Sequence, residues 1–266
     1  MTGRLVSTIM VAAVALALAA PGAVAKKHGE RYHEDIHESF DVGKSPRLTL
    51  NNVNGDVTIT GADVAQIEVD VTKAAGSQER LEDVKVEFEQ HGDHVSIEVD
   101  YDHGDHERWD NNDGASVEFT IRVPRGTRID GVDLVNGDLS IEGVAGAVDA
   151  ASVNGDVTGD GLAGDVDLSA VNGDVRLNAT GPVGSIKLHS VNGTVELSVP
   201  KDASARVSAS TLHGSIRGTG DIRAEKNYVG SSLSSVFGKG EGRISLDTVN
   251  GNIRIYRAGE AQAEED

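Results

Sequence analysis

The sequence contains no cysteine, which excludes a disulfide framework, a thiol nucleophile, an iron–sulfur cluster and cysteine-ligated zinc. Aromatic residues make up only 3% of the chain, fewer than sugar-binding clefts and base-stacking platforms usually contain. Proline is also scarce, with 5 residues, whereas glycine accounts for 32 of the 266. Much glycine with little proline indicates many tight turns rather than a disordered linker.

Positive charge is in short supply as well. The 24 lysines and arginines face 43 aspartates and glutamates, which gives a formal net charge of −19. A chain of this sign repels phosphates, so nucleic-acid binding is not expected. The same repulsion argues against an anionic membrane surface as a partner.

The N-terminus has the pattern of a secretory signal peptide over 1–25. An apolar run over 5–20 follows Arg4, and small residues precede a cleavage position after Ala25. The run has about 16 residues, which is shorter than the ~20 needed to span a bilayer. We therefore expect an exported protein, periplasmic or extracellular at the cell surface, with no membrane span after signal cleavage.

The strongest signal in the chain is an internal repeat. The tripeptide Val-Asn-Gly occurs six times, and Leu212-His213-Gly214 stands where a seventh is expected. Successive copies from 136 to 192 lie 18 to 20 residues apart, which is the signature of a repeat architecture. The asparagines of the six copies are Asn54, Asn136, Asn154, Asn172, Asn192 and Asn250.

Each repeat predicts two short strands and two turns. Apolar residues alternate with polar ones on both sides of Asn-Gly, as at Ile186, Leu188 and Val191 before it and Val195 after it. Asn-Gly is a strong turn dipeptide because both residues tolerate positive φ. A second glycine-rich turn closes each repeat.

Two arrangements satisfy this pattern, a meander of antiparallel hairpins and a coil in which each repeat stacks on the previous one. A lone pair of short strands cannot bury its apolar face, whereas stacking pairs every backbone group and forms columns of identical side chains. The equal spacing favours stacking. We predict an all-β fold, a β-solenoid of two-strand rungs of about 18–21 residues each, with a narrow aliphatic core.

The regions around the repeats give the expected domain organisation. We predict a flexible charged lead-in over 26–40, a repeat domain over 41–256 and an acidic disordered tail over 257–266. Within the domain, 66–123 is expected to be an antiparallel β insertion or end cap, because an open end would present unpaired strand edges. The Gly/Ser-rich segment 226–242 is expected to be a loop that replaces one repeat.

Finer signals mark the insertion. Ser77 with Glu-Arg-Leu-Glu at 79–82 predicts one or two helical turns over 77–83. The residues 90–93, Gln-His-Gly-Asp, have the pattern of a hairpin turn between two strand-like runs. Both features set the insertion apart from the regular repeats.

The Val-Asn-Gly-Asp turns, Val123-Pro124-Arg125-Gly126 before the second repeat and the closing segment 242–251 resemble one bacterial family of β-strand repeats. This family is known as domain of unknown function 4097 and is associated with adhesins. The resemblance covers about 41–256. It implies a β-solenoid at the cell envelope with an interaction role, and some relatives have links to envelope-stress signalling. The family defines no catalytic residue, cofactor or agreed ligand.

The aspartates that follow Asn-Gly allow two interpretations. They are Asp56, Asp138, Asp156 and Asp174. Stacked carboxylates about 4.8 Å apart repel each other and could hold Ca²⁺ through oxygen ligands. Aspartate also suits a turn, where its side chain bonds the local backbone. The glycine-rich nonapeptide of calcium-binding coils is missing, which favours the turn role, and the asparagines are expected to form a hydrogen-bonded ladder.

Histidines supply the second candidate site. His91, His94, His103 and His106 form two His-x-x-His pairs beside several aspartates. Imidazole with carboxylate suits Zn²⁺, Ni²⁺ or Cu²⁺, although histidines in polar loops are often only solvated. The third candidate is an apolar anchor for a partner, Tyr228, Leu233 and Phe237, which interrupt the coil; these side chains could equally pack over its last turns.

These observations predict a non-enzymatic, adhesin-like binding or scaffold module of the cell envelope, with no cofactor. Its expected partner is an envelope protein or a cell-wall polymer. The alternatives are an envelope metal-binding protein that uses the 91–106 region and a polysaccharide-active β-helix enzyme. The carboxylate pairs that such an enzyme needs are abundant here, so no particular pair is diagnostic.

Overall fold

The computed structural model describes residues 32–101, 114–182, 184–219, 225–226 and 230–257. Strands dominate these residues, and the one helix among them is α1 (Gln78–Asp83). The predicted all-β class is confirmed. No helix in the described ranges is long and apolar enough to cross a membrane. The predicted signal peptide and nearly all of the predicted acidic tail lie outside the described residues.

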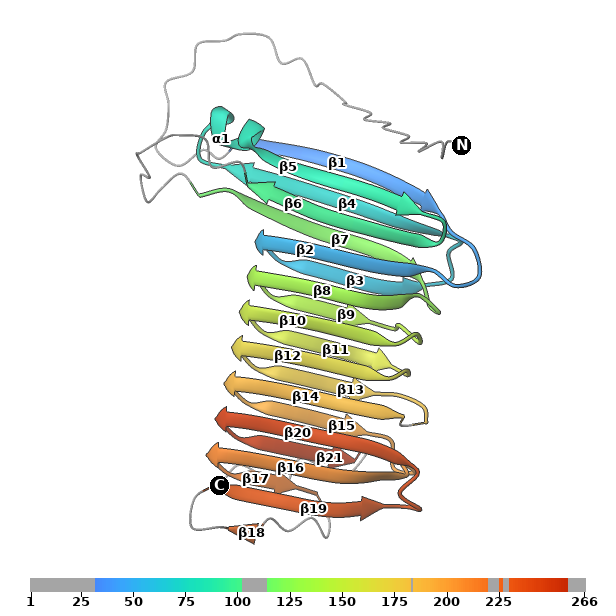
Figure 1. Cartoon of the computed structure of the whole chain (residues 1–266), viewed down its shortest axis with the longest axis vertical. Helices are drawn as coiled ribbons and strands as arrows, with labels where there is room; N and C mark the ends of the chain where they lie inside the picture. The colour runs from blue at the N-terminus through green and yellow to red at the C-terminus, as the bar shows by residue number, and fades with distance from the viewer. Residues whose placement is uncertain (1–31, 102–113, 183, 220–224, 227–229, 258–266) are drawn as a thin grey trace, which may run out of the picture. The chain divides into compact units, whose positions relative to one another are not determined.

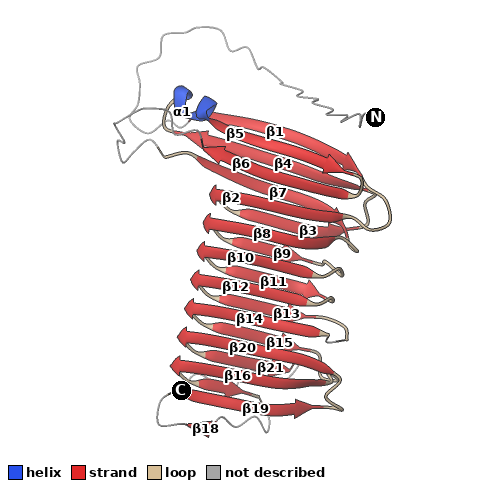
Figure 2. Ribbon diagram, in the orientation of Figure 1, coloured by secondary structure: helices blue, strands red, loops and turns tan. Residues whose placement is uncertain are grey.

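The strands form two large sheets (Figures 1 and 2). In order across the ten-stranded sheet, they are β1 (Tyr32–Asp41), β4 (Gln66–Ala75), β7 (Ser116–Pro124), β3 (Val57–Ala62), β9 (Leu139–Glu142), β11 (Val157–Leu162), β13 (Val175–Ala179), β15 (Val195–Val199), β21 (Ile253–Arg257) and β17 (Ile216–Gly218). The eleven-stranded sheet runs β18 (Glu225–Lys226), β19 (Ser231–Phe237), β16 (Ala205–His213), β20 (Gly242–Asn250), β14 (Ser185–Asn192), β12 (Val166–Asn172), β10 (Val148–Asn154), β8 (Arg128–Asn136), β2 (Arg47–Asn54), β6 (His94–Tyr101) and β5 (Val84–His91).

Each repeat contributes one strand to each sheet, and strands of neighbouring repeats are parallel. Thus β12 and β13 come from one repeat, and β12 pairs with β10 on one side and β14 on the other. The register places equivalent residues side by side, as for Asn154, Asn172 and Asn192. The antiparallel meander is therefore excluded for these repeats.

The core lies between the sheets because side chains alternate in direction along each strand. In β12, Val166, Leu168 and Ala170 are buried, whereas Asp167 and Ser169 face outward. The same alternation occurs in β15, where three aliphatic side chains point inward. Parallel register then stacks aliphatic side chains on one another from repeat to repeat, and their removal from water stabilises the stack.

The glycine of each Val-Asn-Gly is required by close contact between repeats. A Cβ on Gly173 would lie 2.0 Å from the carbonyl oxygen of Gly155, and one on Gly193 would lie equally close to the oxygen of Gly173. The asparagines do not use the positive φ that the Asn-Gly pattern allows, since no described non-glycine residue has positive φ. The asparagines end their strands instead.

The predicted asparagine ladder is present. Five side-chain amides each donate from Nδ2 to Oδ1 of the asparagine in a neighbouring repeat, at 2.8 to 2.9 Å. The chain of bonds runs through Asn250, Asn192, Asn172, Asn154, Asn136 and Asn54. These bonds reinforce the backbone pairing along one edge of the eleven-stranded sheet.

The N-terminal end is closed by antiparallel strands from the predicted insertion and by one strand that the sequence analysis missed. The expected flexible lead-in is wrong over 32–40, because these residues form most of β1, which pairs with β4 over ten positions. Ile36 and Phe40 of β1 turn toward the core, and Lys73 of β4 donates to Glu34 at 2.6 Å. Apolar packing and an ion pair therefore both hold β1 against β4.

Two finer predictions for this end are confirmed. The helix α1 follows Ser77, whose hydroxyl accepts a hydrogen bond from the backbone N–H of Arg80. The predicted turn at 90–93 joins β5 to β6 in an antiparallel hairpin. The edge strands of the two sheets at this end, β1 and β5, carry many charged side chains. Charge on an edge strand opposes the pairing of a further strand with it.

The C-terminal end differs from the predicted order. Residues 231–237 of the expected loop over 226–242 form β19 instead, which pairs antiparallel with β16. The last repeat in the sequence does not come last in the stack: β20 lies between β14 and β16, and β21 lies between β15 and β17 (Figure 1). A strictly sequential coil is therefore wrong for the final two strand pairs.

Candidate binding face

The outer face of the eleven-stranded sheet carries a row of exposed valines. Each precedes the asparagine of its repeat and points outward, so parallel register aligns them across the strands. Four of them, Val53, Val135, Val153 and Val171, are 39–40% exposed, and the fifth is half-buried. We call this row the valine column and define it as Val53, Val135, Val153, Val171 and Val191.

A groove of about 530 Å³ runs beside the valine column. The small side chains of Ala151 and Ser169 lie on its floor, between the valines and the larger outward residues of the same strands. Glu98 and Asp133 also line it, together with His189. Among the lining residues there is no lysine or arginine, so the groove combines apolar surface with negative charge.

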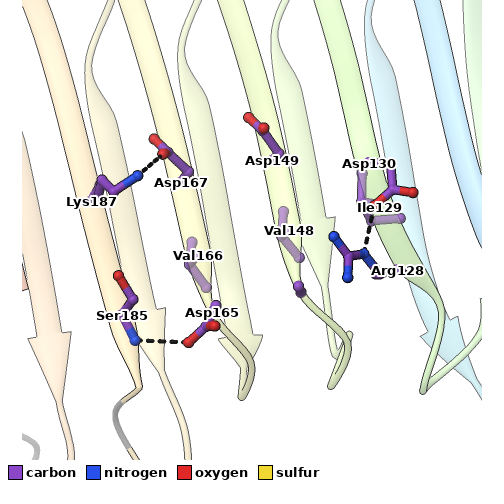
Figure 3. A pocket seen from close by; sticks show the side chains of 11 residues that line it. Arg128, Ile129, Asp130, Val148, Asp149, Asp165, Val166, Asp167, Ser185 and Lys187 are labelled. Atoms are coloured by element: carbon purple, nitrogen blue, oxygen red, sulfur yellow. Dashed lines mark hydrogen bonds and ion pairs between the residues drawn. The ribbon is translucent and has the colours of Figure 1, made fainter. Parts of the chain in front are cut away.

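A second, smaller pocket of about 270 Å³ lies farther along the same strands (Figure 3). Two of its carboxylates are paired: Lys187 donates to Asp167 at 2.8 Å and Arg128 donates to Asp130 at 2.6 Å. Asp149 lies between these pairs and makes no salt bridge among the described residues (Figure 3). Partial burial and then repulsion from Asp167 raise the pKa of Asp149. This pocket adds to the negative potential of the face.

The aspartates that follow Asn-Gly have a structural role that links repeats. The carboxylate of Asp138 accepts the backbone N–H of Asp156 at 2.8 Å, and that of Asp156 accepts the N–H of Asp174 at the same distance. The bond therefore joins neighbouring repeats rather than closing the local turn. Burial raises the pKa of Asp156, but this N–H and the guanidinium of Arg176 outweigh it, so the net pKa is lowered.

The histidine pairs are only partly within the described residues. His91 and His94 flank the hairpin turn, but His91 lies 3.6 Å from Glu89 and His94 lies 3.2 Å from the hydroxyl of Thr49. Across the described ranges, no three side chains of the metal-ligating types gather at one point. His103 and His106 lie outside these ranges, so metal binding by the four histidines stays a prediction.

The two described residues of the predicted apolar anchor are buried rather than exposed on the surface. Leu233 and Phe237 of β19 are 5% and 2% exposed, because the pairing of β19 with β16 turns them into the core. The guanidinium of Arg257 covers the Phe237 ring at 4.4 Å. The assignment of these two side chains as partner contacts is wrong, and Tyr228 lies outside the described residues.

Comparison with known proteins places the repeats in a family. The model of the Toastrack DUF4097 family matches residues 131–256. This region belongs to the Toastrack family. The resemblance predicted from the Val-Asn-Gly-Asp turns is thus confirmed, and the Toastrack match spans the repeats from β8 to β21 but not the N-terminal end. No curated protein matches the sequence.

Solved structures similar to this chain include a candidate cell adhesion protein from Clostridium sporogenes, with 18% identity and a TM-score of 0.44, covering 85% of this chain and 100% of that one. A candidate adhesin from Bacteroides fragilis has 12% identity and a TM-score of 0.40, with coverage of 84% and 97%. A candidate lipid-binding protein from Parabacteroides distasonis has 13% identity and a TM-score of 0.31, with coverage of 87% and 98%.

Proposed function

We propose that the protein is a non-enzymatic β-solenoid with rungs of about 18–21 residues, which acts as an adhesin-like binding or scaffold module at the bacterial cell envelope, outside the cytoplasm. The Toastrack match and the N-terminal sequence 1–25 support this proposal. A role in the envelope-stress response is part of it, because the sequence resemblance implies that link. The binding surface is the face that carries the valine column.

The valine column is the observation that carries the proposal. Isolated exposed aliphatic side chains are ordinary on soluble proteins, but a contiguous apolar row is a mark of an interaction site. Here the row repeats with the period of the strands and borders a groove that crosses β8, β10, β12 and β14. Three strand spacings of about 4.8 Å make this stretch roughly 14 Å long.

The shape and charge of the groove define the partner. An extended segment that runs across the strands would follow the valines and place its own apolar groups against them. Glu98 and Asp133 favour positive charge on that segment, and the net charge of −19 adds long-range attraction. The partner is therefore an envelope protein or cell-wall polymer that carries both apolar groups and positive charge.

One juxtaposition on this face invites an enzymatic alternative. Ser169, His189 and Asp247 occupy matching positions on neighbouring strands. No hydrogen bond joins Ser169 to His189 or His189 to Asp247 in the described structure, and the Asp247 carboxylate accepts bonds from Ser210 and Ser245 instead. Backbone N–H groups within the sheet are engaged in strand pairing, which leaves no oxyanion-binding pair beside the serine. This geometry favours binding over hydrolysis.

The test is binding to immobilised cell-envelope extract by purified protein. The double variant Val153→Lys/Val171→Lys adds positive charge in the middle of the valine column and should lose most of its binding. The matched control, Ser140→Lys/Thr158→Lys, makes the same change at outward positions of the ten-stranded sheet. Circular dichroism melting verifies that both fold.

Three outcomes would count against the proposal. Equal retention of the two double variants would reject the valine column as the binding face. Absence of wild-type binding to any extract would reject the binding role itself. Release of products from acyl-ester or polysaccharide substrates, lost in Ser169→Ala, would establish the enzymatic alternative instead.

A further inference from the structure

The last repeat of the sequence occupies an interior position in the stack. In chain order β14–β15 is followed by β16–β17 and only later by β20–β21. In space β20–β21 separates the two earlier pairs (Figure 1, red between orange strands). We call the space that β20–β21 occupies the slot, and the strand pairs β14–β15 and β16–β17 on its two sides the walls. Both walls come before β20–β21 in the sequence.

Both strands of the inserted pair, β20 and β21, form hydrogen-bonded pairs with the strands on either side of them. β20 pairs with β14 from 243 to 250 and with β16 from 242 to 250, and β21 pairs with β15 and β17. Side chains add links on both sides: Thr248 donates to the carbonyl oxygen of Gly193 at 3.1 Å, and Thr211 donates to that of Gly251 at 2.9 Å. Ile244 and Leu246 are completely buried.

The two walls also match each other. Ile186 of β14 and Val207 of β16 pair with the same residue, Ile244, from opposite sides. Leu188 and Ala209 are related in the same way through Leu246. The two walls therefore present apolar side chains in the same register on either side of the inserted strand pair.

Entry into the slot requires the walls to separate. The connection from β19 to β20 passes around the turn at Ser204, where the backbone N–H groups of Lys239 and Gly242 donate to the hydroxyl and carbonyl of that serine. Gly238 and Gly240 in this connection have φ values of +54° and +71°. The strand pair is thus joined to the rest of the chain by a short connection with two glycine pivots.

We infer that the slot is an acceptor site for β20–β21 of a second copy of this chain, so that two molecules can exchange their C-terminal strand pairs. The exchanged segment would make the same hydrogen bonds and bury the same side chains as the intrachain one. Only the connection at 238–241 would change its path. Such exchange of identical elements is a low-cost route to a dimer.

The intrachain segment competes with an effective concentration on the order of millimolar. Exchanged dimers therefore form in proportion to protein concentration and are favoured where many copies gather on a surface. The net charge of −19 opposes association, so raised salt should increase the exchanged fraction. The inference does not depend on the proposed binding function of the valine column.

The absence of cysteine allows a direct test by disulfide trapping. His189 of β14 and Asp247 of β20 are register partners on the outer face, and neighbouring strands hold Cα atoms within the range that a disulfide spans. One full-length copy carries His189→Cys and another carries Asp247→Cys. The two are mixed in urea, refolded together and oxidised, and the products are separated on a non-reducing gel.

The expected result is a disulfide-linked heterodimer that increases with total protein concentration. The control mixture combines His189→Cys with Ser210→Cys, because Ser210 pairs with Asp247 and lies one strand beyond it. This control measures chance collision between exposed thiols. The double variant His189→Cys/Asp247→Cys in one chain should close an intrachain disulfide and so verify the geometry.

Exchange predicts several-fold more heterodimer from the 189/247 mixture than from the 189/210 mixture. Equal yields from the two mixtures, with an efficient intrachain disulfide in the double variant, would overturn the inference. Heterodimer that does not increase with protein concentration would also overturn it. The proposed function is tested separately, by cell-envelope binding of a strictly monomeric preparation. If that binding persists, the proposed function holds whether or not strand exchange occurs.

Discussion

Nδ2 of Asn154 lies 2.9 Å from Oδ1 of Asn136, its counterpart in the preceding repeat. Asn172 donates to Asn154 in the same direction at 2.8 Å. Each interior asparagine of the ladder is therefore donor to one neighbour and acceptor from the other. This one-way chain explains why aspartate or serine would not serve equally well, since neither can donate and accept across a strand spacing with one planar group.

Loss of a ladder amide should weaken the stack measurably. Asn154→Ala removes two side-chain hydrogen bonds at a solvent-exposed position, so we expect a loss of about 1 kcal/mol in the free energy of unfolding. Asn51→Ala changes the same residue type on the outer face of β2, away from the ladder, and should change stability by less than about 0.5 kcal/mol. Urea denaturation of the two variants provides the comparison, and equal stability would contradict the ladder's contribution.

A methyl group at a repeat glycine should be far more damaging. Gly173→Ala would place a Cβ 2.0 Å from the carbonyl oxygen of Gly155, and backbone atoms on both sides are fixed by strand pairing. We expect a loss of about 3 kcal/mol or more, or failure to fold. Gly126→Ala is the control, because its Cβ would meet no atom within 4 Å. Similar melting temperatures for the two variants would show that the contact between repeats can relax.

Asp149 should lower stability at neutral pH. Its pKa is raised in the folded state by partial burial and by Asp167 and Asp133, so stability is lost as the pH rises through that pKa. Asp149→Asn should therefore be more stable than the wild type at pH 7, and the gain should vanish below pH ~4, where the unfolded carboxyl is also protonated. Urea titrations at pH 7 and pH 3 measure this difference.

The control for this pH effect is Asp167→Asn. Asp167 accepts a hydrogen bond from Lys187, so its removal should not stabilise the protein at pH 7. A gain of equal size in both variants would attribute the effect to net charge alone. A gain in Asp149→Asn that persists at pH 3 would contradict the assignment to the partly buried, ionised carboxylate of Asp149.

The regular part of the fold could be predicted because one tripeptide carries several constraints. The spacing from Asn136 to Asn192 indicated stacking of the repeats, and Asn-Gly indicated a tight turn in each of them. The physical reason for the glycine was different from the one expected: Gly173 meets a neighbouring repeat, and positive φ is not the general requirement. Contacts between repeats cannot be seen within a single repeat's sequence.

The candidate site was harder to predict, although its signal is present. Ile186 and Leu188 point inward, so alternation places Ser190 inward and Val191 outward. The sequence pattern was interpreted with Val191 in phase with Ile186 and Leu188, and for this reason the valine column was not predicted. The order of the last strand pairs could not be deduced, because Asn250 has the same motif wherever its repeat inserts.

The strand β1 escaped prediction because its inward positions alternate polar and apolar residues. Glu34 takes one of these positions and accepts a hydrogen bond from Lys73, which is 6% exposed, at 2.6 Å. Glu34→Gln should cost about 2 kcal/mol, less than the 3–5 typical of a fully buried pair because Glu34 is partly exposed. Glu38→Gln, on the same strand, should change stability by less than about 0.5 kcal/mol.

The loss in Glu34→Gln should be recovered when the ammonium is removed as well. Lys73→Met fills a similar volume without charge, so the double variant Glu34→Gln/Lys73→Met should regain most of the stability. Amide hydrogen exchange should report the effect as faster opening of β1 and β4 in the single variant and restored protection in the double variant. If the two substitutions were simply additive in urea denaturation, the ion pair would not be what holds β1 against β4, and its docking would rest on Ile36 and Phe40 alone.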